Sequence, residues 1–196
     1  MASGAVLLFV LSTCSCSKYS SPSAVADQRD QQVLQALLLH LLPKPDFDLT
    51  RVGANSTTIV LDSRTPGGNR LFQPDVLRRP HDIGSDHVIP KDIQRDAARR
   101  NGDVPASLSD FKFEPGITLT ALPRSSGRGT DPLWFQHAYP NGRAWVHAWL
   151  PGYSIDSNRA LVRAWIGPSA QGALITAFLA RTEGKWSVEW YYFERF

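Results

Sequence analysis

Residues 143–196 read RAWVHAWLPGYSIDSNRALVRAWIGPSAQGALITAFLARTEGKWSVEWYYFERF, and this stretch decides the fold. It contains four apolar, alternating runs separated by short polar segments, at residues 143–150, 159–166, 172–180 and 185–193. Alternation with a period of two is typical of β-strands, and short polar connections between such runs are typical of hairpins. We therefore predict that this part of the chain forms an antiparallel β-meander.

The same period of two gives the first two strands of the meander two different faces. The even positions are uniformly apolar: Ala144, Val146, Ala148, Leu150, Ala160, Val162, Ala164 and Ile166. The odd positions combine aromatic rings with cations, and the residues of interest there are Trp145, His147, Trp149, Arg163 and Trp165. We expect the even face to pack on another element. We expect the odd face to be only partly covered, with tryptophan rings stacked on arginines, and to be a candidate binding surface for a protein, peptide or glycan.

An amphipathic helix is predicted at residues 28–42, near the start of the chain. Leucine and valine recur there at helical spacing and form one stripe: Val33, Leu34, Leu37, Leu38, Leu41 and Leu42. Asp27 is suited to cap the first turn, and Pro43 and Pro45 end the helix. The stripe is the best candidate to cover the even face of the meander. The result is an α+β fold with an N-terminal helix packed on a C-terminal antiparallel sheet.

The middle of the chain contributes shorter elements. A β-branched run at residues 57–61 predicts a strand. Pro90 suits the first turn of a helix at residues 91–100, which an Asn-Gly pair ends. Residues 111–113 and 117–122 alternate, and they predict a further strand or pair of strands.

The two cysteines of the chain, Cys14 and Cys16, both follow an apolar run at residues 5–11. The run is too short to span a bilayer, and it matches the core of a secretory signal. The cysteines that follow it resemble the lipobox of bacterial lipoproteins, in which the cysteine thiol is acylated and becomes the mature N-terminus. The resemblance implies an exported protein of the cell envelope, anchored in a membrane by lipid at Cys14 or Cys16. Plain cleavage with release of the domain, and a cytoplasmic location, are the alternatives.

The predicted organisation has three parts: a signal and lipobox segment at residues 1–16, a small polar tether at 17–26 and a single globular domain at 27–196. The formal net charge is +3, but acidic and basic residues are interspersed, and the sequence shows neither a basic cluster nor a known nucleic-acid recognition motif. We therefore expect no nucleic acid among the partners. No glycine-rich loop with phosphate-binding spacing follows a strand, and we expect no cofactor.

Two sets of residues have side chains of the types that bind metals or carry out catalysis. One loop carries residues that can bind a metal: His81, Asp82, Asp86 and His87. This loop lacks the spacing of a calcium loop and the helical histidine pair of a zincin, so a solvent-exposed polar loop is the alternative. The second set is Ser154, Asp156 and His147, which are the residue types of a catalytic triad. Its serine lies in a hairpin loop and not in a G-x-S-x-G elbow. Neither the metal-type loop nor this set of three residues is therefore specific for a catalytic site.

Several motifs in the C-terminal half are similar to those of a family of uncharacterised bacterial exported proteins. The motifs are LPGYS at 150–154 with Asp156, RALV at 159–162, GPS at 167–169, GA at 172–173 and GKW at 184–186 with Val188. In that family an Ala-Leu-Val strand, a Gly-rich hairpin and a final Gly-Lys-Trp-x-Val strand close an antiparallel sheet, so the resemblance implies this fold and no activity. The helix-first, sheet-last order is also similar to NTF2-like cone domains, which bears on fold and not on function.

Three functions remain open on these grounds. The first is a non-catalytic envelope or binding domain that uses the face of Trp145, Trp149, Arg163 and Trp165. The second is a metal-dependent hydrolase built on the loop at residues 81–87. The third is a purely structural domain of an envelope assembly, in which the tryptophan face is a second core layer under the helix at residues 91–100. We favour the first and third over an enzyme.

Overall fold

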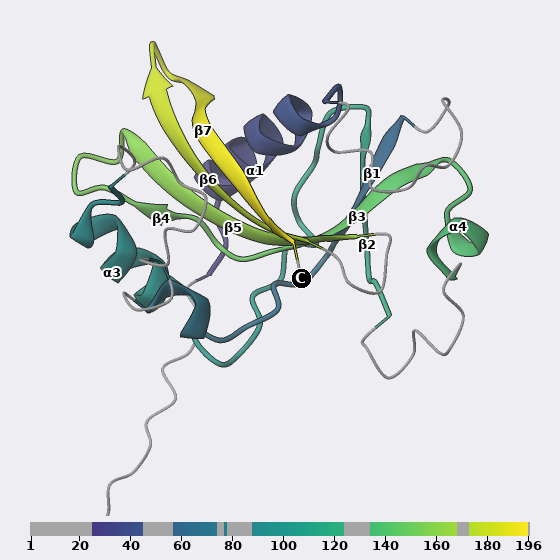
Figure 1. Ribbon diagram of the computed structural model, residues 1–196, viewed down its shortest axis with the longest axis horizontal. Coiled ribbons are helices and arrows are strands. Elements are labelled where there is room, and N and C mark those ends of the chain that lie inside the picture. The colour runs from purple at the N-terminus through teal and green to yellow at the C-terminus, as the bar shows by residue number, and fades with distance from the viewer. Residues whose placement is uncertain are drawn as a thin grey trace, which may run out of the picture.

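The computed structural model describes residues 25–44, 57–73, 77, 88–123, 134–167 and 173–195. Within these ranges the helices are α1 (Gln28–Leu41), the short 3-10 helix η2 (Arg70–Phe72), α3 (Lys91–Arg100) and α4 (Trp134–Ala138). The strands are β1 (Thr58–Asp62), β2 (Ile117–Thr120), β3 (Gly142–Ala148), β4 (Gly152–Tyr153), β5 (Arg159–Gly167), β6 (Ala173–Thr182) and β7 (Lys185–Arg195). Helices packed with one large sheet confirm the predicted α+β class (Figure 1).

All the described strands belong to one sheet, in the order β2-β1-β3-β5-β6-β7, with β4 paired to β5. β3, β5, β6 and β7 run antiparallel to one another in turn, which confirms the predicted meander. β1 runs parallel to both of its neighbours, β2 and β3, so the sheet is mixed. This parallel half was not predicted, because nothing in a short β-branched run identifies the strands with which it pairs.

The hairpin of β6 and β7 is closed by a two-residue turn, Glu183 and Gly184. Both residues have positive φ, 53° and 79°, which is the backbone that a type I′ turn requires. Figure 1 shows the tip of this hairpin at the upper edge of the molecule. The tight turn fixes the register from its first pair, Thr182 with Lys185.

The predicted cap of α1 is present and is reciprocal. The Asp27 side chain accepts a hydrogen bond of 3.0 Å from the backbone N–H of Asp30. The Asp30 side chain accepts one of 2.9 Å from the backbone N–H of Asp27. Together they form a capping box, which satisfies two N–H groups that a helix start leaves without partners. The sequence therefore fixes where α1 begins.

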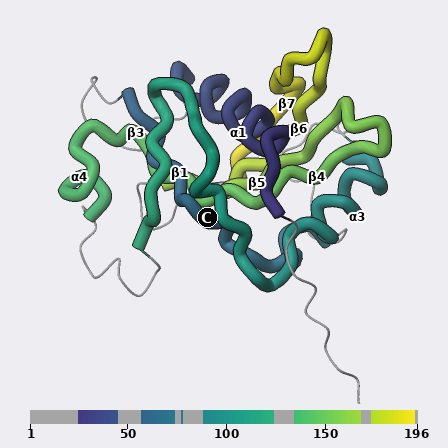
Figure 2. Tube along the Cα trace, turned by 180° about the vertical axis from the view of Figure 1, so that it is seen from behind, coloured from purple at the N-terminus to yellow at the C-terminus, as the bar shows by residue number. Residues whose placement is uncertain are grey.

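α1 covers one face of the sheet, which we call the α1 face. Its stripe of buried leucine and valine side chains shares a core with the apolar even positions of β3 and β5 and with the inward side chains of β1 and β6. The two views agree on this arrangement: α1 lies behind the sheet in Figure 1 and crosses in front of it in Figure 2. The predicted packing of the leucine stripe on the even face is thus confirmed. Apolar burial of this kind stabilises a fold by about 25 cal/mol per Å².

One local prediction was wrong. Residues 111–113 form no strand; Phe111 and Phe113 instead pack their rings against the core under α1. The alternation of these aromatic residues reflects burial and not a strand. Shortly before β3 the chain forms the short helix α4, whose Phe135 is buried and for which no element was predicted.

Candidate functional site

The five predicted binding residues lie in β3 and β5 or directly after β3, and we call their side of the sheet the tryptophan face. Three of the five side chains on this face are buried, and His147 and Trp165 are partly buried. Residues of η2 and α3, together with Leu77 and Ile89, pack on Trp149, and Leu122 and Phe135 pack on Trp145. The exposed fractions are 5% for Trp145, 4% for Trp149 and 0% for Arg163. The expectation of a partly covered face is therefore wrong for these three side chains, because η2 and α3 on one side, and Leu122 and α4 on the other, close over them.

Arg163 does not stack on a tryptophan ring, as was expected, but donates hydrogen bonds. Its guanidinium bonds Thr176 Oγ1 at 2.9 Å, Glu194 Oε1 at 2.6 Å and the backbone carbonyl of Leu71. A buried guanidinium needs acceptors for its N–H groups, since an unpaired buried charge is strongly destabilising. Arg163 therefore joins β5, β6 and β7 to η2, and its role in this arrangement is structural.

His147 faces a carboxylate. Its Nδ1 lies 2.8 Å from Oδ2 of Asp62, the last residue of β1. Asp62 Oδ1 accepts hydrogen bonds from the backbone N–H groups of Arg64 and Leu122. A carboxylate held in this way fixes the orientation of the imidazole ring, as it does for a histidine that acts as a general base. The sequence did not indicate this pair, because its members lie on two strands that are far apart in the chain.

The predicted trio of Ser154, Asp156 and His147 is not arranged as a triad. Ser154 Oγ donates to Asp156 Oδ1 at 2.5 Å, and both residues belong to the turn between β4 and β5. The hydroxyl of Ser154, followed by the backbone N–H of Asn158, lowers the pKa of the Asp156 carboxyl. The carboxylate that contacts His147 is Asp62 instead. The serine and its aspartate thus stabilise a turn and do not activate a nucleophile.

Two sets of predicted residues lie outside the described ranges. They are the lipidation candidates Cys14 and Cys16, and the metal candidates His81, Asp82, Asp86 and His87. Their roles remain predictions. Among the residues that the structure does describe, no group of three or more histidine, cysteine or acidic side chains is placed to hold a metal ion.

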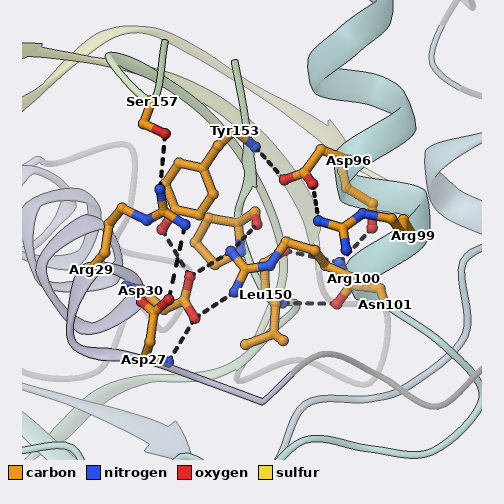
Figure 3. A network of polar contacts seen from close by, with 12 residues as sticks. Asp27, Arg29, Asp30, Asp96, Arg99, Arg100, Asn101, Leu150, Tyr153 and Ser157 are labelled. Atoms are coloured by element: carbon orange, nitrogen blue, oxygen red, sulfur yellow. Dashed lines mark hydrogen bonds and ion pairs between the residues drawn. The ribbon is translucent and has the colours of Figure 1, made fainter. Parts of the chain in front are cut away.

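The structure assembles a buried polar network that was not predicted (Figure 3). Arg100, at the end of α3, donates two hydrogen bonds of 2.8 Å to the carboxylate of Asp30 in α1. The Tyr153 hydroxyl, on β4, donates to the same carboxylate at 2.8 Å. Arg100 also donates to the carbonyl of Pro151. One carboxylate thereby ties together α1, α3 and β4.

Two guanidinium groups also contact the ring of Tyr153. The Cζ atom of Arg29 lies 3.8 Å from the ring centroid, and that of Arg100 lies 5.0 Å from it. Burial raises the pKa of the Tyr153 hydroxyl well above its usual value, and the Asp30 carboxylate raises it further. Burial by itself would lower the pKa of Arg100, but the hydrogen bonds and charge of Asp30 raise it. The network therefore keeps a neutral phenol beside a charged pair.

Asn101 and Asp96 extend this network to the backbone of the segment that contains β4. The Asn101 side chain donates to the carbonyl of Leu150 and accepts from its N–H, both at 2.9 Å. Asp96 accepts a hydrogen bond of 2.9 Å from the backbone N–H of Tyr153. α3 is therefore fixed against the chain between β3 and β5 by side chains that replace a strand partner. We regard the whole network as a structural device.

An open hollow of about 660 Å³ lies next to α3, and we call it the α3–β6 hollow. Its walls come from the start of α3, from the turn between β4 and β5, from the end of β6 and from β7. The residues that line it are Pro90, Asp92, Ile93, Ser154, Ile155, Asp156, Asn158, Arg159, Ala180, Arg181, Thr182 and Glu189. Both charge signs and two isoleucines are thus present in one depression, which suits a ligand with apolar and charged groups.

Comparison with protein-family models, curated proteins and solved structures finds no match to this chain. The resemblances to the uncharacterised exported family and to NTF2-like domains therefore remain predictions.

Proposed function

We propose that this chain is an exported, lipid-anchored binding domain without catalytic activity, and that it binds an extended segment of a partner protein at the α3–β6 hollow. The observation that carries the proposal is the position of Ile155. This side chain lines the hollow and is 91% exposed, in the hydrogen-bonded turn between β4 and β5. An apolar side chain held in water by a fixed turn is a suitable anchor for an interface.

Hydrogen bonds fix the turn that presents Ile155. Ser154 Oγ accepts from the backbone N–H of Arg159, and Asp156 Oδ1 accepts from the backbone N–H of Asn158. The backbone N–H of Ile155 itself donates to Asp92 at the start of α3. A rigid turn loses little conformational entropy when a partner binds, so more of the contact energy appears as affinity.

The charges around the hollow favour a peptide over a purely apolar ligand. Arg159 and Arg181 line it together with the acidic Asp92, Asp156 and Glu189. A protein segment that carries an apolar side chain with acidic and basic neighbours would match this lining, and such complementarity sets orientation and partner choice. The predicted tryptophan surface is not used in this proposal, because Trp145 and Trp149 are buried.

The experiment is site-specific photo-crosslinking in cells. A benzophenone amino acid replaces Ile155 in one variant and Val104, which is 58% exposed in a loop outside the hollow lining, in the control. We expect a discrete crosslinked partner at position 155 and none at position 104. Once the partner is purified, Ile155→Asp should weaken its binding by about 30-fold, as expected for an interface anchor, whereas Val104→Asp should not. Equal crosslinking at both positions, or none at position 155, would contradict the proposal.

The membrane anchor is proposed from the sequence, with Cys14 or Cys16 as the acylated residue. In the described part of the chain, no helix is long and apolar enough to cross a membrane. Several acyl chains would hold the domain firmly, since each buried CH₂ contributes about 0.8 kcal/mol. Incorporation of labelled palmitate should be lost in either Cys14→Ser or Cys16→Ser, and the other substitution is then the control. Label that persists in the double variant would exclude lipidation at these positions.

A second candidate function is a structural domain of an envelope assembly. The observation that favours it is the burial of Trp145, Trp149 and Arg163 under η2, α3, α4 and Leu122. This is the arrangement expected if the tryptophan face is a second core layer. Partner capture that requires Ile155 would favour the binding domain over this alternative.

A further inference from the structure

β7 forms one edge of the sheet, and its only strand partner in the described part of the chain is β6. It contains 11 residues, whereas strands average about 5 to 6 residues. It contains no proline and has aromatic side chains at residues 186, 190, 191, 192 and 193, all of them only partly buried. A long edge strand of this kind is a template on which another strand can pair.

A bulge changes the pattern of side chains along β7. Trp190 pairs with Phe178 and Val188 pairs with Leu179, so Glu189 is an extra residue without a partner of its own. Because of this extra residue, four side chains on both sides of the bulge lie on the α1 face: Trp186, Val188, Tyr191 and Phe193. Without the bulge, the first pair and the second pair would lie on opposite faces.

The backbone groups of these four residues point away from β6. Arg181, the partner of Trp186 in the hairpin, donates its N–H to the carbonyl of Asn158, on the side of β5. The Arg181–Trp186 pair is therefore a pair without mutual hydrogen bonds, and the backbone of Trp186 faces outward. In a strand, the direction of the backbone groups alternates together with the face of the side chain, so residues 188, 191 and 193 also face outward.

We infer that β7 pairs antiparallel with β7 of a second copy of this chain, about a two-fold axis between Glu189 and Trp190. In this register Trp186 lies opposite Phe193 of the second copy, and Val188 lies opposite Tyr191. It is the one register in which all four outward-facing residues pair with outward-facing residues. A shift by two positions in either direction places one of them opposite Glu189 or Trp190, which face inward.

The charges at the ends of the strand agree with this register. Lys185 lies opposite Glu194 of the second copy, and the two-fold axis produces this contact twice. Glu194 accepts hydrogen bonds from Arg163 at 2.6 Å and from the Tyr192 hydroxyl at 2.9 Å, and its side chain remains 33% exposed, which leaves room for a lysine of the second copy. Opposite charges across a strand pair are stabilising, and aromatic pairs add to them. The interface is isologous and closed, which gives a dimer and not a fibre.

The experiment uses the full chain, purified in detergent, and a carbodiimide that joins an ammonium directly to a carboxylate. Within one chain, Lys185 and Glu194 are about 30 Å apart, because nine steps of a strand separate them. A crosslinked peptide that contains both residues can therefore come only from two chains. We expect this peptide, together with a dimer in analytical ultracentrifugation.

Two variants test the register. Lys185→Glu replaces two opposite-charge contacts by two like-charge contacts, and it should weaken the dimer by about tenfold. Lys112→Glu makes the same charge change at an exposed residue outside β7, and it should leave the dimer unchanged. Glu189→Gln should strengthen the dimer by about threefold, because two like charges near the axis are removed. A chain that is monomeric at its highest soluble concentration, or a dimer whose crosslinks join other residues, would overturn the inference.

Discussion

Two buried arginines, Arg100 and Arg163, are enclosed in different ways. Arg100 pairs with Asp30, whose side chain is 0% exposed, whereas Arg163 pairs with Glu194, whose side chain is 33% exposed. The Arg100 pair joins α1, α3 and β4, which share no continuous strand ladder, whereas Arg163 joins strands that already pair in the sheet. A buried arginine thus joins two helices to a strand in one place, and in the other it reinforces an edge strand of the sheet. The first pair should therefore matter more for stability.

The largest expected effect comes from removing Asp30. Asp30→Ala leaves the buried Arg100 without a counter-charge and also breaks the capping box of α1, so we expect a loss of about 3 to 5 kcal/mol in the free energy of unfolding. Urea denaturation followed by circular dichroism measures it. The milder Asp30→Asn keeps the shape and should lose less, and the exposed Asp110→Ala is the control. A loss below about 1 kcal/mol for Asp30→Ala would mean that water reaches Arg100.

Removing Glu194 should cost less. In Glu194→Ala, Arg163 keeps its hydrogen bonds to Thr176 and to the carbonyl of Leu71, and water can reach the vacated position. We expect a loss of about 1 to 2 kcal/mol, again from urea denaturation. Asp110→Ala, at an exposed residue outside the strand, is again the control and should be close to neutral. If Glu194→Ala proved as costly as Asp30→Ala, the difference between the two arginines would not hold.

The smallest expected effect comes from Tyr153, and it depends on pH. Tyr153→Phe removes the hydroxyl that bonds Asp30 but keeps the ring between Arg29 and Arg100, so about 1 kcal/mol should be lost at neutral pH. The pKa of Tyr153 is raised above its usual value of 10.0 in the folded state. As the pH rises past 10, the unfolded state therefore loses this proton first, and stability falls.

The dependence of the free energy of unfolding on pH above 10 tests whether stability falls as predicted. The wild-type free energy of unfolding should fall more steeply above pH 10 than that of Tyr153→Phe, which has no hydroxyl at this position to ionise. Urea denaturation at a series of alkaline pH values gives both slopes. Parallel slopes would show that the folded state does not hold the phenol neutral.

The α1 face could be predicted because each of its parts has a local signal. The alternation of residues 143–166 defined the strands and their apolar side, and the leucine stripe with Asp27 defined α1. The short polar segment that contains Glu183 and Gly184 also predicted a hairpin connection, and both residues have the positive φ of its turn. In each case residues close together in the chain determine the conformation, so periodicity is sufficient.

The tryptophan face and the buried network could not be predicted, because they depend on residues far apart in the chain. Nothing near Arg163 indicates that η2 supplies a carbonyl to it, and a Trp-Arg face has the same alternation whether it is open or covered. From the sequence, Asp30 is only an acidic residue in the first turn of the predicted helix. Its pairing with Arg100 depends on how α3 docks, and the sequence of α3 does not specify where it docks.

The position of β1 has a consequence for how the chain folds. β1 pairs on both sides with strands that follow much later in the sequence, whereas β6 pairs with the strands that directly precede and follow it, β5 and β7. Closing the long segments that separate β1 from its partners costs entropy before any pairing energy is gained. We therefore expect the C-terminal hairpins to form early and β1 to enter the sheet late. Pulsed hydrogen exchange during refolding would show this order if the amides of β6 are protected before those of β1.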